Sequence, residues 1–226
     1  FSSIVAAVEE GRGIYDNIRK TLQFLLGGNV GEVLLMSLCV IVGLPAPLLP
    51  IHLLWINLVT DGLPALCLAT DPIDSDVMKR PPRRRFERIT DRSFLITLGL
   101  TGCLTAGAAL AVFLYVLRTG TVESARTQAF AVLVYAELFR SLGNRSETKP
   151  LWRVPLLSNV NLVMIVAASL GLQVWSQHNE VFGRFLKTSL VPFAEGFWLF
   201  AVGAIPLVVL EIVKARSLSF SAVRRK

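Results

Sequence analysis

"WINLVTDGLPA", residues 55–65, places polar residues inside an otherwise apolar run. Asn57, Thr60 and Asp61 stand at positions i, i+3 and i+4, so on a helix all three project from one face. A glycine follows at once, and then Pro64, which has no N–H and clashes with the carbonyl four residues earlier. The stretch therefore predicts a membrane helix that is interrupted near Thr60 and frees backbone carbonyls there, which membranes tolerate only around a cavity or a ligand.

The composition around this stretch is that of a membrane protein. Of the 226 residues, 53% are hydrophobic and 17% charged, and the mean hydropathy is +0.59, which is too apolar for an ordinary soluble domain. The predicted fold is all-α: a polytopic bundle of six transmembrane helices, with the first helix extended into a cytosolic stalk over residues 1–21. The predicted spans are 22–44, 51–70, 93–117, 127–143, 159–178 and 193–213.

The positive charges predict the orientation of these spans, because cytoplasmic loops collect Lys and Arg. One side carries 19 of the 23 such residues, so both chain ends are predicted to be cytosolic. The basic cluster at 79–88 is interpreted as a loop near anionic lipid headgroups, since it lacks the interleaved aromatics that stack on bases; nucleic acid is not an expected partner. The segments on the predicted cytosolic side are 1–21, 71–92, 140–158 and 214–226.

Small residues in the spans are interpreted as packing surfaces. Cysteines are odd in number, lie in apolar stretches and have no paired spacing, so they indicate neither a disulfide framework nor a zinc site. The residues concerned are Gly27 and Gly31 in the first span, Gly99, Gly102, Ala106 and Gly107 in the third, and Cys39, Cys67 and Cys103.

Three acids lie inside predicted spans: Glu32, Asp61 and Glu137. A charge at the bilayer centre costs roughly 2.5–3.5 kcal/mol, so three unpaired anions would cost on the order of 7–10 kcal/mol. They must be protonated, paired with arginine, or bound to a cation.

The neighbours of the acids favour a hard cation. Asn29 precedes Glu32 by one turn, and Asn57 and Thr60 accompany Asp61, so the set offers carboxylate, amide and hydroxyl oxygens. Ca²⁺ takes six to eight oxygen ligands, whereas transition metals prefer the nitrogen and sulfur donors that are missing from these positions. The alternative is that these polar groups only hold the helices together through interhelical hydrogen bonds.

Arg140 follows Glu137 at i+3 and has two possible roles. It can reach the carboxylate and compensate its charge. It can also extend to the cytosolic interface, which its position near the end of the span permits and which we slightly favour on sequence grounds.

The residues described so far belong to longer motifs that resemble one protein family. The chain is similar, over essentially its whole length, to the C-terminal membrane half of P-type Ca²⁺-transporting ATPases of the sarco(endo)plasmic-reticulum type, including their bacterial relatives. Because it begins at Phe1 without an initiator Met, we expect it to be a piece of a longer chain. The motifs that carry the resemblance are "FSSIVAAVEEGRGIYDNIRKTLQFLLGGNVGEVLL", "LPIHLLWINLVTDGLPALCLATDP", "DVMKRPPR" and "VLVYAELFRSLGNRSETKPLW".

The resemblance implies a division of the chain and a set of ligands. Residues 1–21 would end the phosphorylation domain and form the stalk, 22–70 an ion-binding hairpin, 71–92 a basic cytosolic loop, 93–213 four further spans, and 214–226 a basic tail. The spans would be the fifth to tenth helices of the family. One Ca²⁺ site would use Asn29, Glu32, Thr60, Asp61 and Glu137, and a second would share Asp61, add Asn57 and draw on a helix outside this chain.

The activity implied by the resemblance is transport of Ca²⁺ at the expense of ATP through an aspartyl-phosphate, with protons as counter-ions. ATP and Mg²⁺ would bind the missing domains, because the phosphorylation and nucleotide motifs are absent here. The expected partners are the first four membrane helices, the actuator, phosphorylation and nucleotide domains, and membrane lipids; the location would be the plasma membrane if the source is bacterial. Two alternatives stay open: a pump for monovalent cations such as Na⁺ or K⁺, and a non-catalytic helix bundle.

Overall fold

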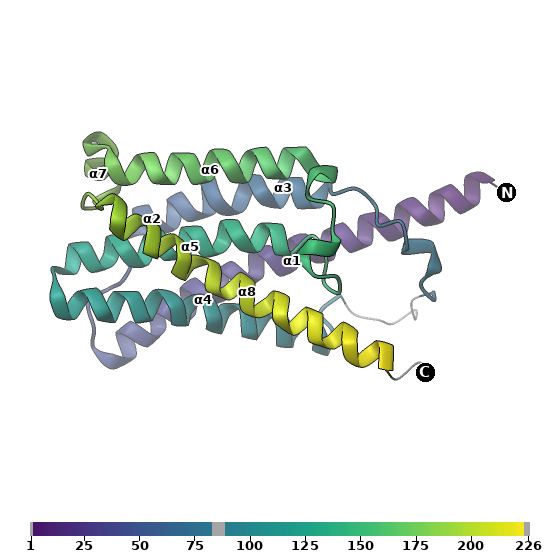
Figure 1. Cartoon of the computed structure of the whole chain (residues 1–226), viewed down its shortest axis with the longest axis horizontal. Helices are drawn as coiled ribbons and strands as arrows, with labels where there is room; N and C mark the ends of the chain where they lie inside the picture. Colours follow the sequence, from purple (N-terminus) through teal and green to yellow (C-terminus); the bar gives the residue numbers. More distant parts are fainter. Residues whose placement is uncertain (1, 83–88, 224–226) are drawn as a thin grey trace.

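The computed structural model describes residues 2–82 and 89–223, and these residues form helices and the loops between them, without a strand among them. This confirms the all-α prediction. Figure 1 shows the long helices lying side by side, with both chain ends at the same end of the bundle. The elements are α1 (Ser2–Val42), α2 (Pro50–Trp55), the π-helix η1 (Ile56–Gly62), α3 (Leu63–Ala69), η2 (Val77–Lys79), α4 (Arg92–Thr119), α5 (Val122–Gly143), η3 (Leu151–Arg153), η4 (Leu156–Asn159), α6 (Val160–His178), α7 (Glu180–Leu186) and α8 (Phe193–Val223).

Within the described ranges, five helical stretches are long and apolar enough to cross a membrane. Helix α5, predicted as the fourth span, is not one of them. Each of its residues from Thr127 to Leu138 is buried, so its polar side chains face protein rather than lipid. The five stretches are Ser2–Val42, Pro50–Ala69, Arg92–Thr119, Leu156–His178 and Phe193–Ser217.

Helix α1 is longer than a membrane crossing needs. Its 41 residues correspond to a length of about 60 Å at 1.5 Å per residue, roughly twice the thickness of a bilayer's hydrocarbon core. Its first turns, residues 2–11, are exposed, and Figure 1 shows this part projecting beyond the bundle. The helix therefore runs without a break from this projection into the centre of the molecule.

The predicted interruption near Thr60 is wrong, because the chain stays helical there and forms a π-helix of seven residues instead. Gly62 and Leu63 keep helical angles (φ −60°, ψ −52° and φ −69°, ψ −47°). Pro64 stands in the first turn of α3, where a missing N–H is tolerated. The Ser169 hydroxyl on α6 donates to Val59 O of the π-helix at 3.3 Å.

Helices α1 and α4 pack closely because small residues line their contact. A Cβ atom on Gly102 would lie 2.5 Å from Val30 Cγ1 and 3.3 Å from the backbone nitrogen of Gly31. Ala106 is also buried, as predicted. Gly99 and Gly107 have nothing within 4 Å of an added Cβ, so these two do not belong to the contact.

A matched pair of substitutions tests this contact. Gly102→Ala should lower the free energy of unfolding by about 1–3 kcal/mol, because the α1 backbone must move to admit the methyl group. Gly99→Ala should raise it by about 0.5–1 kcal/mol, because alanine loses less conformational entropy in a helix and meets open space. Thermal inactivation of the two purified variants measures the difference, and equal midpoints would contradict the close contact.

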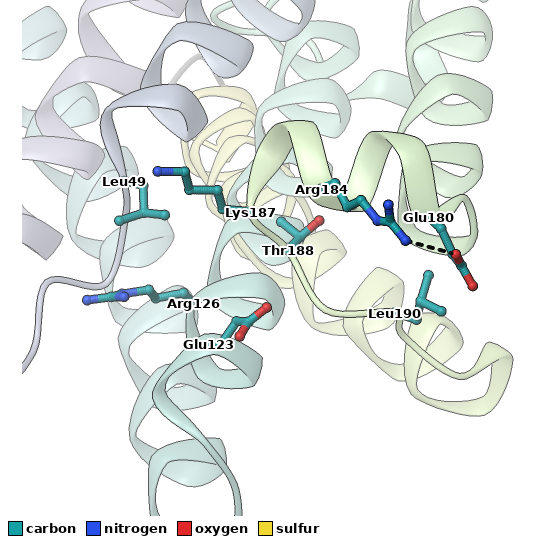
Figure 2. Close-up of a pocket in the computed structure, with 9 residues that line it drawn as sticks. Leu49, Glu123, Arg126, Glu180, Arg184, Lys187, Thr188 and Leu190 are labelled. Carbon is teal, nitrogen blue, oxygen red and sulfur yellow. Dashed lines mark ion pairs between the residues drawn. The ribbon is translucent and has the colours of Figure 1, made fainter.

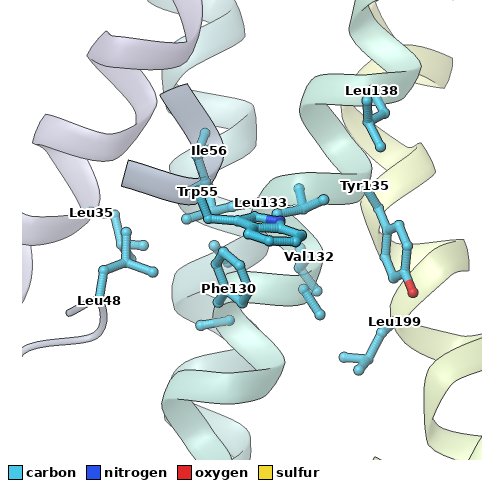
Figure 3. Close-up of a cluster of buried hydrophobic side chains, with 14 of the residues drawn as sticks. Leu35, Leu48, Trp55, Ile56, Phe130, Val132, Leu133, Tyr135, Leu138 and Leu199 are labelled. Atoms are coloured by element: carbon cyan, nitrogen blue, oxygen red, sulfur yellow. The ribbon is translucent and has the colours of Figure 1, made fainter. Parts of the chain in front are cut away.

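Apolar side chains from several helices surround α5. Figure 3 shows Trp55 and Phe130 at the centre of this cluster, with Leu35 and Leu199 reaching it from α1 and α8. Two of the cysteines, Cys39 and Cys67, belong to the same buried core, which confirms their interpretation as packing residues. Cys103 is exposed instead, and all three thiols are free.

The end of the bundle that carries both termini, called the terminal end, is held by buried polar contacts. Asp71, which follows α3, accepts hydrogen bonds from Arg145 Nε at 3.0 Å and Asn159 Nδ2 at 2.8 Å, and pairs with Lys20 of α1 at 3.1 Å. Arg19 of α1 pairs with Asp91 and Glu147 in the same region, at 2.8 and 2.7 Å. These contacts therefore join, in the part of the chain that the structure describes, segments that were predicted to lie on the same side of the membrane.

The basic loop at 79–88 is partly committed to protein contacts. Arg80 pairs with Asp16 at 2.6 Å and with Asp76 at 2.7 Å, so its charge is compensated within the chain rather than by lipid. Burial alone would raise the pKa of Asp76, but hydrogen bonds from Arg80 and Lys149 outweigh it and hold that pKa below its usual value. The rest of the predicted lipid-facing cluster, residues 83–88, lies outside the described residues.

Candidate functional site

Three helices bring the predicted acids into the interior of the bundle. Glu32 on α1 is 7% exposed, Asp61 on η1 is 2% exposed and Glu137 on α5 is 1% exposed. Asp61 lies within electrostatic range of both other acids and of Arg140. The sequence positions of the acids were therefore correctly interpreted as inward-facing.

Several oxygen atoms of this acid cluster have no hydrogen-bond partner. They are Glu32 Oε1, both carboxylate oxygens of Asp61, and Glu137 Oε1. A buried polar atom without a partner costs about 1–3 kcal/mol, and more when it is charged. The cluster therefore requires a positive charge or protons to be stable.

Two threonines add hydroxyl oxygens to the same region. Thr60 is fully buried, and its hydroxyl donates to Ile56 O at 2.8 Å, which leaves the oxygen lone pairs free to accept. Thr105 on α4 lies against Gly31 of α1, and its Oγ1 is buried without a partner. Thr105 was missed in the sequence analysis. Its hydroxyl lies among the small residues of a predicted span, and this position could have indicated a buried polar group.

The two predicted asparagine ligands lie outside the buried cluster. Asn29 and Asn57 are both exposed. The Asn57 amide donates back to Leu53 O of its own helix at 2.8 Å. The structure thus separates the six predicted ligands into a buried group, made of the acids and Thr60, and an exposed pair.

Arg140 points into the protein, so the interpretation that it extends to the membrane interface is wrong. Its side chain is 1% exposed and forms an ion pair with Glu137 Oε2. The guanidinium also donates to Gln23 O at 3.5 Å and lies 4.9 Å from the Phe24 ring centroid. The i, i+3 spacing from Glu137 was the sequence signal for this pair.

The acids do not form a complete metal-ligand set by themselves. Among the described residues, no group of three or more His, Cys, Asp and Glu side chains is placed to hold one ion. One oxygen of Glu137 is occupied by Arg140, which leaves Glu32 and Asp61 as the carboxylates without a cationic partner. The expectation that three carboxylates share one ion therefore stays a prediction.

Two cavities near the ends of the bundle contain none of the three acids. A cavity of about 480 Å³ at the terminal end is lined by Arg140, Glu211 and Lys214, among others. A second, of about 750 Å³, lies at the opposite end, where Figure 2 shows Arg126 and Lys187 on either side of Leu49. Its mixture of acidic and basic side chains is exposed, unlike the acid cluster, so we place the candidate site at the acids.

Comparisons with known proteins identify the family of the chain. Residues 45–216 match the family model for the C-terminus of cation-transporting ATPases. Calcium-transporting ATPase 1 of Bacillus cereus is 37% identical over 95% of this chain and 26% of its own length. The calcium-transporting ATPase of Bacillus subtilis is 38% identical over 93% of the chain and 24% of its own length, and the human calcium-transporting ATPase type 2C member 1 is 29% identical over 95% and 23%. The chain spans about a quarter of the length of the curated relatives that it matches.

Proposed function

Because the chain belongs to the cation-transporting ATPase family, whose C-terminal part it matches, we propose that it is the ion-binding membrane portion of a P-type pump that moves Ca²⁺ at the expense of ATP. The observation that carries this proposal is the pair of buried acids Glu32 and Asp61, whose three unpartnered oxygens lack a compensating cation. Ca²⁺ is a hard cation that takes oxygen ligands of this kind. Relatives named as calcium-transporting ATPases support the choice of ion.

Further ligands would come from the exposed side of the site. Asn29 and Asn57 lie on α1 and η1, the elements that carry Glu32 and Asp61, and both amides are exposed. Another part of the pump packed over this face would bring their oxygens into a closed, water-poor site. We propose that the first four membrane helices of the pump are that part, and that the actuator, phosphorylation and nucleotide domains supply ATP and Mg²⁺ binding.

The bundle is proposed to cross the membrane six times. Helix α5 would be the span that the other helices shield from lipid, because the residues from Thr127 to Leu138 are all buried. The terminal end, with its excess of Lys and Arg, would face the cytosol, so the projecting part of α1 would be a cytosolic stalk. In a bacterium this membrane would be the plasma membrane.

Helix α1 suggests how ATP hydrolysis could reach the ion. One continuous helix joins the projecting segment to Glu32, so a push on the stalk would move this acid relative to Asp61 on η1. When the ion leaves, protons would be the alternative means of neutralising the buried carboxylates. This chain would therefore hold and release the ion, and the other domains would perform the phosphoryl transfer.

The proposed function is tested by measuring which cation triggers phosphorylation. In the full-length pump, phosphorylation by ATP should depend on Ca²⁺, and Glu32→Gln should raise the half-saturating Ca²⁺ concentration by at least about tenfold, equivalent to about 1.4 kcal/mol. Glu195→Gln is a matched control, because the Glu195 carboxylate already has a hydrogen-bond partner in Gln128, at 2.8 Å. Phosphorylation that depends on Na⁺ or K⁺ and not on Ca²⁺ would favour the pump for monovalent cations. The absence of any phosphoenzyme would favour the non-catalytic helix bundle.

A further inference from the structure

We propose that Ser169 and Gln173 on α6 are positioning residues that hold the π-helix η1 and thereby direct Asp61 toward the ion. This proposal rests on the proposed function, because it concerns how the same aspartate is placed. Neither residue is one of the predicted ligands, and both side chains are buried, Ser169 at 4% and Gln173 at 1% exposed. Figure 1 shows α6 running beside α3, which directly continues η1.

Two hydrogen bonds join α6 to the π-helix. Trp55 directly precedes η1, and its indole Nε1–H donates to Gln173 Oε1 at 3.1 Å. The Ser169 hydroxyl donates to Val59 O, inside η1, at 3.3 Å. The bonded positions are four residues apart on each helix, so the two contacts are in register along antiparallel helices. They span the point at which the chain changes from α-helix to π-helix.

The Ser169 hydroxyl bonds to another helix and not to its own. Serine and threonine side chains inside a helix commonly donate back to a carbonyl of the preceding turn. Thr60, Thr127 and Ser176 do so here, at 2.8, 2.9 and 2.8 Å. The Ser169 contact therefore fixes the position of Val59 relative to α6.

The indole of Trp55 is held by packing as well. Phe182 of α7 lies edge-on to it, with ring centroids 6.2 Å apart and planes at 76°. Figure 3 shows the Trp55 ring inside the buried apolar cluster, next to Phe130. Because the ring is held on several sides, its hydrogen bond to Gln173 connects the first residue of this turn firmly to α6.

The width of the helical turn decides where Asp61 points. A π-helix bonds each N–H five residues back instead of four. Its turns hold more residues, so successive side chains are rotated by less than the roughly 100° of an α-helix. A return to α-helix after Trp55 would rotate Asp61 about the helix axis and away from the interior, where it is now 2% exposed. Contacts that hold η1 therefore also aim this carboxylate.

Ser169→Ala in the full-length pump tests the proposal, because it removes the donor to Val59 O. The half-saturating Ca²⁺ concentration for phosphorylation by ATP should rise by about three- to tenfold, equivalent to about 0.7–1.4 kcal/mol. The amount of phosphoenzyme at saturating Ca²⁺ should not change, since the displaced aspartate still binds the ion when enough is supplied. A smaller amount of phosphoenzyme with an unchanged half-saturating concentration would reveal a merely structural role and overturn the proposal.

Ser176→Ala is the matched control. Ser176 is a buried serine of the same helix, but its hydroxyl donates to Gln173 O of α6 itself. This variant should keep the half-saturating Ca²⁺ concentration of the unmodified pump. An equal rise in the two alanine variants would show that any lost hydroxyl on α6 has this effect, and the proposal would be wrong.

A double variant removes both contacts to η1. Gln173→Met combined with Ser169→Ala should raise the half-saturating Ca²⁺ concentration by at least about tenfold, equivalent to about 1.4 kcal/mol. A folded double variant with the unmodified Ca²⁺ dependence would refute the positioning role and leave the proposed function intact. An unmodified pump whose phosphorylation ignores Ca²⁺ would instead refute the proposed function, and the positioning role with it. Should the double variant fail to fold, Ser169→Ala alone decides.

Discussion

Replacing Asp61 by Asn should abolish Ca²⁺-dependent phosphorylation of the full-length pump at micromolar Ca²⁺. Asp61 is 2% exposed, and both of its carboxylate oxygens are buried without a partner. Removing one member of a desolvated charge pair costs about 2–5 kcal/mol, and about 2.7 kcal/mol corresponds to a hundredfold loss of affinity. We therefore expect the half-saturating Ca²⁺ concentration to rise by about a hundredfold or more, a larger effect than for Glu32→Gln.

The measurement is the amount of phosphoenzyme formed from ATP over a Ca²⁺ titration. Glu211→Gln is the control, because Glu211 is also a buried acid of a membrane helix but accepts hydrogen bonds from the Leu151 backbone and pairs with Lys214, at 2.5 and 2.7 Å. It should reduce stability and leave the Ca²⁺ dependence unchanged. Asp61→Asn protein that elutes as a folded pump and responds to Ca²⁺ like the unmodified one would refute the ion site at Asp61.

The acids illustrate what sequence reasoning achieves in a membrane protein. The cost of a charge in hydrocarbon is so large that Glu32, Asp61 and Glu137 had to face the interior, and they do. The same reasoning does not distinguish the edge of a helix face from its centre. Asn29 stands one turn from Glu32 yet is exposed, because helix neighbours at i and i+3 are rotated by about 60°.

The errors concern contacts between helices that are distant in sequence. Pro64 indicated a break, but the chain stays helical, because Pro64 falls in the first turn of α3, directly after the π-helix. Gly99 and Gly102 looked equivalent as small residues, yet Gly102 is the one that faces α1. Arg140 could have turned to the interface, and what decides its inward position is the room beside the α1 glycines.

The second large effect is expected at the terminal end, where Asp71 joins three separate parts of the chain. Its carboxylate is 3% exposed and pairs with Arg145 and with Lys20 of α1, and it accepts a hydrogen bond from Asn159. The Asp71 carbonyl also accepts from Asn17 of α1, at 2.6 Å. This residue therefore ties α1 to the segment that follows α5, at the base of the projecting helix.

Asp71→Ala should lower the free energy of unfolding by about 3–5 kcal/mol, because it leaves the buried Arg145 guanidinium without its counter-charge. Thermal inactivation of the purified full-length pump measures this loss. Asp74→Ala is the matched control: the Asp74 side chain is 27% exposed and pairs with Arg80 and Lys149, so water replaces much of what is lost and the cost should stay within about 1 kcal/mol. Arg145 has further hydrogen bonds to Pro155 O and Ser158, at 2.8 and 2.6 Å, which hold it in place when Asp71 is removed. The Arg145 charge therefore stays buried in Asp71→Ala instead of moving into water. Equal losses of unfolding free energy in Asp71→Ala and Asp74→Ala would show that burial does not govern the strength of these ion pairs.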